Sequence, residues 1–164
     1  MMRRPRGFTM IELMVVVGIV AILALLALPN YSEKFIRDQI VEALPLADIA
    51  KAPVAASWAL TQTFPADNAA SGLPSADKIV SNYVASVTVQ NGAIHIVFGN
   101  KANNQIAGKT LTLRPAVVED APIVPVAWIC GTATTPDKMT VKGANKTSVL
   151  QIHLPLKCRG PAPQ

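Results

Sequence analysis

The chain has 164 residues, of which 51% are apolar, 15% charged and 5% aromatic. This length suits one domain plus an additional element, and the apolar fraction excludes an intrinsically disordered chain. Much of the apolar excess lies near the start, because residues 8–28 contain a single charge, Glu12. A helix of these 21 residues would rise about 30 Å, the thickness of a bilayer core, so we expect an apolar membrane segment over residues 8–34.

The formal net charge is +5, and three of the positive charges, Arg3, Arg4 and Arg6, precede the apolar segment. Basic residues ahead of a single span hold that end in the cytoplasm and place the rest of the chain outside it. The two cysteines, Cys130 and Cys158, would then lie in an oxidising compartment, where a disulfide persists. Two cysteines allow one pairing, and closing this loop would contribute about 3–4 kcal/mol of stability.

Glu12 is the unusual residue of the apolar segment, because a carboxylate near the centre of a bilayer costs about 3 kcal/mol. It belongs to the sequence GFTMIELM at residues 7–14, which resembles the processing site of type IV prepilins. The resemblance implies that a prepilin peptidase removes the leader, residues 1–7, by cutting between Gly7 and Phe8. It also implies that Phe8 is N-methylated by the same peptidase and methyltransferase system.

Cleavage would supply the cation that Glu12 lacks, namely the new amine of Phe8. The two residues are four apart and could meet on one helix face. The resemblance instead implies that Glu12 pairs with Phe8 of a neighbouring subunit during assembly. On that reading the apolar helix serves first as a membrane anchor and later as the packed core of a filament.

The helix is expected to continue beyond the membrane. Pro29 stands where the family has a helix-bending proline. Apolar residues recur every fourth position over residues 36–44, so we extend the helix to about residue 61. Pro45 and Pro53 are each expected to bend or interrupt it.

Turn-forming residues over 63–82 predict a loop, and a β-rich region follows. Asn91-Gly92 between two β-rich runs predicts a hairpin. The expected strands cover about 83–89, 94–98, 109–114 and 123–130, and prolines make the last one an edge strand or one that starts late. The predicted fold class is therefore α+β: a long N-terminal helix packed on a four-stranded antiparallel sheet, with a disulfide loop over 130–158. The globular domain would span residues 35–164.

Charge is distributed unevenly after the proposed leader. Residues 30–77 hold three basic and six acidic side chains, whereas residues 78–164 hold nine basic and three acidic ones. The basic side chains near the end that could contact DNA or another subunit are Lys138, Lys142, Lys146, Lys157 and Arg159. A third interpretation is that these side chains form an ordinary solvated surface. No aromatic residues lie between them, which weakens the interpretation that they bind single-stranded DNA.

No pattern in the sequence indicates an enzyme. His95 and His153 have no neighbouring nucleophile and no cluster of acidic or thiol ligands, so they predict neither catalysis nor a metal site, and no cofactor is expected. We interpret both as surface or hairpin histidines.

The resemblance implies a structural subunit of a type IV pilus that supports adhesion, twitching motility or DNA uptake. Its partners would be other copies of the chain, the inner membrane before assembly, the prepilin peptidase and the pilus assembly machinery. Its globular domain would face the periplasm before assembly, and the pilus would be extracellular. The alternatives are a minor or competence pilin that binds DNA, a secretion-system pseudopilin, and a membrane-anchored periplasmic binding domain that keeps its leader.

Overall fold

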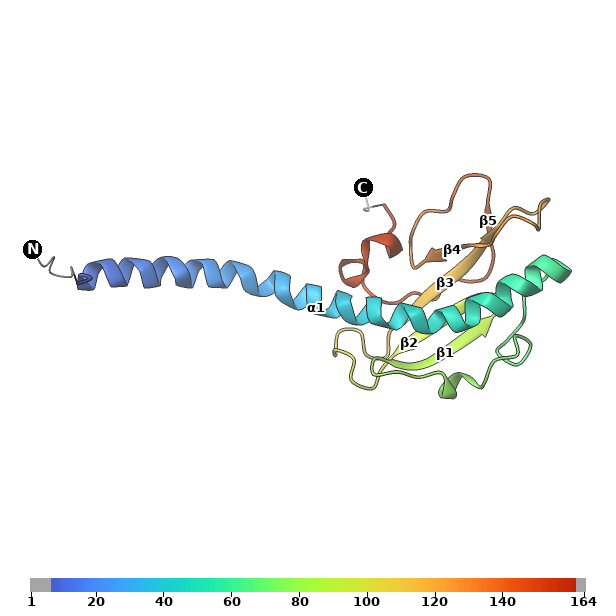
Figure 1. Ribbon diagram of the computed structural model, residues 1–164, viewed down its shortest axis with the longest axis horizontal. Helices are drawn as coiled ribbons and strands as arrows, with labels where there is room; N and C mark the ends of the chain where they lie inside the picture. Colours follow the sequence, from blue (N-terminus) through green and yellow to red (C-terminus); the bar gives the residue numbers. More distant parts are fainter. Residues whose placement is uncertain (1–6, 162–164) are drawn as a thin grey trace, which may run out of the picture. The chain divides into compact units, whose positions relative to one another are not determined.

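A computed structural model describes the backbone of residues 7–161 and, apart from residues 27–30, their side chains (Figure 1). All of the predicted leader except Gly7 therefore lies outside the described residues. The chain divides into two compact units, Met1–Phe35 and Ile36–Gln164. One long helix, α1 (Met10–Thr61), contributes to both units.

In the first unit, the described side chains of residues 7–26 are all exposed. They include Val16, which is 49% exposed, and Phe8, which is 82% exposed. By length and composition this helix is apolar enough to cross a membrane. Within the unit, the described apolar side chains have nothing to pack against, so they require a lipid or protein environment.

The helix is uninterrupted from Met10 to Thr61, although it contains Pro29, Pro45 and Pro53. Pro45 and Pro53 were each expected to bend or interrupt the helix, and the expected interruption is wrong. A proline removes one backbone hydrogen bond, and the neighbouring turns keep theirs. Residue Gln62 ends the helix with a positive φ of 55°, and its N–H donates to the carbonyl of Trp58. The side chain of Pro29 lies outside the described ones, and its kink stays a prediction.

In the second unit, α1 buries one face against the sheet (Figure 1). The spacing of three or four residues places the buried positions on one stripe of the helix. These positions are Ile36, Ile40, Ala43, Leu44, Ala47, Ala50, Val54 and Trp58. The core is completed by apolar residues of the strands, such as Val87 and Ile96, which are fully buried.

The sheet is an antiparallel meander in the order β1-β2-β3-β4, which confirms the predicted fold class. Its strands are β1 (Val84–Gln90), β2 (Ala93–Phe98), β3 (Thr110–Val117) and β4 (Ala127–Cys130). Asn91 and Gly92 join β1 to β2 with φ values of 48° and 81°, the left-handed pair that a two-residue hairpin needs. The predicted hairpin is confirmed. Three short 3₁₀ turns, η1 (Ala76–Lys78), η2 (Gln151–His153) and η3 (Leu156–Cys158), complete the described elements.

Two features of the sheet differ from the prediction. Strand β3 continues through Pro115 to Val117, and a fifth strand, β5 (Thr140–Val141), pairs with its far end. Pro115 is tolerated because β2 pairs with β3 only as far as Leu113, and the carbonyl of Pro115 accepts the N–H of Lys142 instead. The fourth strand starts late, at Ala127.

The loop between α1 and the sheet is fastened to the edge strand β1 by one buried side chain, Asn68. Its Oδ1 accepts the N–H of Val89 at 2.6 Å, and its Nδ2 donates to the carbonyl of Val87 at 3.0 Å. Nδ2 also donates to the carbonyl of Pro74 within the loop, at 3.0 Å. The Asn68 side chain therefore forms hydrogen bonds with backbone groups of β1 that would otherwise have no partner at the edge of the sheet.

Candidate functional site

The N-terminal end of α1 is closed by a reciprocal pair of hydrogen bonds between Thr9 and Glu12. The Thr9 hydroxyl oxygen accepts the N–H of Glu12 at 3.3 Å, and Glu12 Oε2 accepts the N–H of Thr9 at 3.4 Å. This is a capping box, which satisfies two N–H groups that the first turn leaves unpaired. The carboxylate also lies at the positive end of the helix dipole. Glu12 is therefore held at the helix terminus by its own chain.

Thr9 is the residue of this candidate site that the sequence did not predict. The signal was present, since Thr-x-x-Glu immediately before an apolar run is a helix-start pattern. The predicted partner of Glu12, the Phe8 amine, exists only after cleavage. A carboxylate can accept about four hydrogen bonds, so the bond from Thr9 leaves room for an amine.

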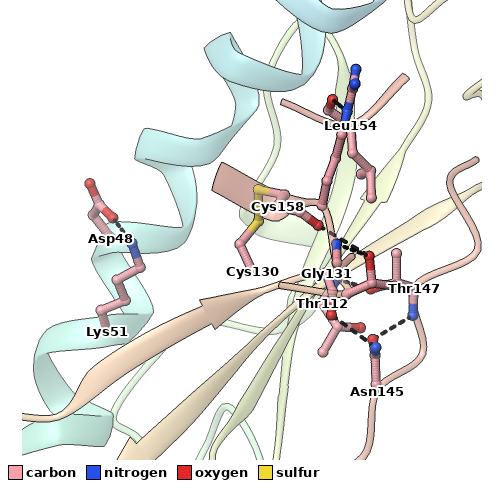
Figure 2. The surroundings of a disulfide bond; sticks show 12 residues. Asp48, Lys51, Thr112, Cys130, Gly131, Asn145, Thr147, Leu154 and Cys158 are labelled. Carbon is pink, nitrogen blue, oxygen red and sulfur yellow. Dashed lines mark hydrogen bonds and ion pairs between the residues drawn. A yellow bond between two sulfur atoms is a disulfide. The ribbon is translucent and has the colours of Figure 1, made fainter. Parts of the chain in front are cut away.

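The second predicted site is the disulfide loop. Cys130 at the end of β4 is bonded to Cys158 in η3, as predicted (Figure 2). Both cysteines are buried. Beside the bond, the N–H of Thr132 donates to the carbonyl of Cys158 at 3.1 Å. The disulfide and this bond fasten the C-terminal segment to the end of the sheet.

The polar part of the loop is held by hydrogen bonds more than by apolar burial (Figure 2). Asn145 Nδ2 donates to the carbonyl of Gly131 at 2.9 Å, and Asn145 Oδ1 accepts the N–H of Thr147 at 3.0 Å. The Thr147 hydroxyl then accepts the N–H of Thr112 on β3 at 3.1 Å. Residues 145–148 thus run beside β3, joined to it by side chains and by one backbone bond from the Ser148 N–H to the carbonyl of Thr110 at 2.9 Å.

The five basic residues predicted as contact residues differ in their surroundings. Three are bonded within the chain: Lys142 to the carboxylate of Glu119, Lys146 to the side-chain oxygen of Gln90, and Arg159 to the carbonyls of Leu154 and Ile152. Among the described residues, Lys138 and Lys157 have no side-chain hydrogen bond or ion pair. A role of the five in contacting DNA or a subunit stays a prediction.

The interpretation of the two histidines as surface or hairpin residues is wrong on exposure, although His95 does lie in the predicted hairpin, on β2. His95 is 5% exposed and His153 is 4% exposed. His95 lies on the face of β2 opposite the core residues Ile94 and Ile96. Residues 145–148 cover that face, which the local sequence does not reveal. Within the described part of the chain, no group of three or more histidine, cysteine or acidic side chains could hold a metal ion.

Comparison of the sequence with known proteins assigns the chain to a family. The family described as pilin, a bacterial filament protein, matches residues 37–159, and the prokaryotic N-terminal methylation motif matches residues 2–28. The chain therefore belongs to the pilin family, and within it to the type IV pilins. Its family consists of structural subunits of bacterial pili, which are not enzymes.

Similar proteins come from Neisseria and Eikenella. The chain is 38% identical to a fimbrial protein of Neisseria meningitidis serogroup A, over 96% of this chain and 95% of the relative. It is 36% identical to the type IV major pilin protein PilE of Neisseria gonorrhoeae, over 94% and 93% of the two chains. The fimbrial protein EcpC of Eikenella corrodens is 38% identical over 66% of this chain and 73% of the relative.

Proposed function

We propose that this chain is a filament-forming type IV pilin, cut between Gly7 and Phe8, N-methylated at Phe8 and polymerised through the first part of α1. The observation that carries the proposal is the contrast between the two units. The described side chains of residues 7–26 are all exposed and almost all uncharged, while residues 36–161 enclose a core of their own. A helix that is apolar on every face needs lipid before assembly and other helices after it.

Glu12 is proposed to direct that assembly. Once the leader is removed, the amine of Phe8 on a neighbouring subunit would be the cation that Glu12 accepts in the apolar filament core. The Thr9–Glu12 capping box supports this role, because it holds the carboxylate at the helix terminus before the neighbour arrives. A charge pair in an apolar environment disfavours wrong registers more than it adds stability.

Before assembly, we propose that the chain is anchored in the inner membrane with its globular domain in the periplasm. The three arginines of the leader support this orientation, and the disulfide supports an oxidising compartment. Assembled filaments would be extracellular and would serve adhesion, twitching motility or DNA uptake. The prepilin peptidase and the assembly machinery are the proposed partners.

Mass spectrometry of filaments sheared from cells tests the proposal. The expected N-terminal peptide starts at Phe8 and is heavier by one methyl group. Filaments whose subunits retain Met1, or an absence of filaments containing this chain, would contradict the proposal.

DNA binding is the second candidate function. Residues 78–164 hold nine basic and three acidic side chains, and Lys138 and Lys157 have no partner among the described residues. Binding through such lysines would be independent of sequence and steeply salt-dependent. Retardation of duplex DNA by purified filaments at low salt, lost at high salt, would support it; no retardation at low salt would exclude it.

A further inference from the structure

A small cavity lies between the second half of α1, the sheet and the disulfide. Its volume is about 160 Å³, and it is lined by Leu44, Lys51, Leu113, Trp128, Cys130 and Lys157. Its wall is apolar in part, where Leu44, Leu113 and Trp128 line it, and polar in part. Two lysines from segments far apart in the sequence, α1 and η3, supply the charge.

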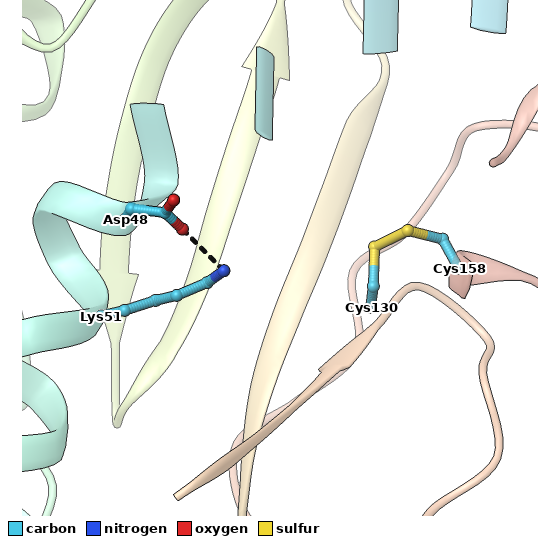
Figure 3. Close-up of polar contacts among 4 residues, drawn as sticks. All are labelled: Asp48, Lys51, Cys130 and Cys158. Atoms are coloured by element: carbon cyan, nitrogen blue, oxygen red, sulfur yellow. Dashed lines mark ion pairs between the residues drawn. A yellow bond between two sulfur atoms is a disulfide. The ribbon is translucent and has the colours of Figure 1, made fainter. Parts of the chain in front are cut away.

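The two lysines are not equivalent. Lys51 Nζ is paired with Asp48 Oδ1 at 2.7 Å (Figure 3). Lys157 has no carboxylate partner among the described residues. The cavity thus has two ammonium groups and one carboxylate beside it, a net charge of +1. The surplus positive charge suits a carboxylate, and the apolar part of the wall suits a short apolar stem that carries it.

The opposite face of the same helix presents such a group. Glu42 and Lys51 are nine residues apart, which at 3.6 residues per turn places them about half a turn apart around the helix. Glu42 is exposed and has no ion pair among the described residues. Apolar side chains are exposed near it, with Val41 46% and Ile49 52% exposed.

We propose that the cavity receives the Glu42 carboxylate of a second copy of this chain, which would lie between Lys51 and Lys157 with its methylene stem against Trp128. This inference rests on the proposed function, in which copies of the chain form a filament. The cavity and Glu42 belong to different surfaces, so the contact is heterologous. Repetition of a heterologous contact that does not close produces an open helical assembly, which is the geometry of a filament. Glu42 is favoured over Asp38 because its stem is one methylene longer.

Chemical crosslinking tests the contact in intact filaments assembled from a mixture of isotopically light and heavy chains. A carbodiimide adds to the carboxylate, and a lysine amine then displaces the resulting urea to form an amide, with net transfer of one water to the carbodiimide. The expected products are peptides joining Glu42 to Lys157 or Lys51, including pairs of mixed isotope content. Filaments in which Lys157 is joined only to Asp38 or Asp48, or to no carboxylate, would overturn the proposal.

Charge reversal is the second test, with filament yield as the readout. Lys157→Glu and Glu42→Lys are each expected to lower the yield about tenfold, because each places like charges in contact. The double variant restores opposite charges and should recover to within about twofold of the unchanged chain. Lys109→Glu is the matched control, since it makes the same charge change at an exposed position that does not line the cavity.

The outcomes separate this inference from the proposed function. If the unchanged chain forms no filaments, the proposed function fails. If it does, an unaffected yield in Lys157→Glu overturns the cavity contact alone. A double variant that assembles no better than either single variant overturns Glu42 as the partner.

Discussion

His95 Nδ1 lies 3.0 Å from the hydroxyl oxygen of Thr112, across the pair of strands β2 and β3. The same oxygen accepts the backbone N–H of Lys146 at 3.1 Å. Either group can donate in the contact between His95 and Thr112, since the hydroxyl has a second lone pair and the imidazole has two tautomers. Nε2 is buried without a partner among the described residues. Protonation of His95 would therefore place a positive charge in a buried position beside β3 and the loop over residues 145–148.

The first prediction concerns pH. Burial, and secondly the positive charge of Lys146, lower the pKa of His95 below its ordinary value of 6.5. The unfolded chain binds a proton near pH 6.5, whereas the folded chain resists it, so stability is complete above pH 6.5 and falls as the pH decreases toward the lower folded pKa. Urea unfolding of the full chain in detergent, from about pH 5 to 8, measures this.

His95→Gln provides the control for that prediction, because an amide does not titrate in this range. The urea midpoint of unfolding of this variant should therefore differ less between acidic and neutral pH than that of the unchanged chain. An identical pH dependence in the two proteins would show that His95 does not cause it.

The second prediction concerns the fastening of the loop by Asn68. Asn68→Ala leaves the N–H of Val89 and the carbonyl of Val87 without their side-chain partners at the edge of the sheet. The expected loss is about 2–3 kcal/mol of unfolding free energy, and the amide of Val89 should exchange with solvent faster. Asn104→Ala, at an exposed position, is the matched control and should be near neutral. Unchanged exchange at Val89 in Asn68→Ala would contradict the prediction.

The third prediction separates the charge of Glu12 from its capping bond. Glu12→Gln keeps a side-chain acceptor for the N–H of Thr9 but removes the charge, whereas Thr9→Val keeps the charge and removes the hydroxyl acceptor. If the charge directs assembly, Glu12→Gln and Glu12→Ala should both lower filament yield about tenfold or more, with membrane insertion and folding unchanged. Thr9→Val should have the smaller effect, since losing a cap costs about 1 kcal/mol.

Filament yield and the membrane-inserted fraction are measured together in that series. Abundant filaments from Glu12→Ala would contradict the role of the carboxylate. Equal losses in Thr9→Val and Glu12→Gln would assign the effect to the cap.

The fourth prediction concerns the disulfide. Replacing both Cys130 and Cys158 with serine should lower the free energy of unfolding by about 3–4 kcal/mol, because the unfolded chain is no longer constrained by the closed loop. The unfolding midpoint in urea measures this loss, and the unchanged chain after mild reduction is the matched comparison. A mass measurement that finds two free thiols in the native protein would contradict the disulfide itself.

Local pattern was sufficient where one short segment decides its own structure. The Asn91-Gly92 turn needs only two residues that tolerate positive φ, and it is formed as predicted. The motif at residues 7–14 identified the family that comparison later showed. The pattern Thr-x-x-Glu at Thr9 and Glu12 is equally local, and it predicts the capping box that the structure contains.

Other features depend on segments that meet only in the folded chain. Strand β5 has two residues and no apolar alternation, so it forms because the far end of β3 has no partner on its β2 side beyond Leu113. His95 is buried because residues 145–148 cover it, and Asn68 is buried because the loop crosses the edge of β1.

The sequence by itself therefore determined the long apolar helix, its carboxylate, the order of the strands and the pairing of the cysteines. Each of these follows from periodicity, local turn chemistry or the count of one residue type. Only the tertiary structure decided which polar side chains are buried and which lysines line the same cavity. Lys51 and Lys157 line one cavity although they are more than a hundred positions apart, and His95 and Asn68 are buried by segments distant from them in the sequence, so no local pattern encodes these features.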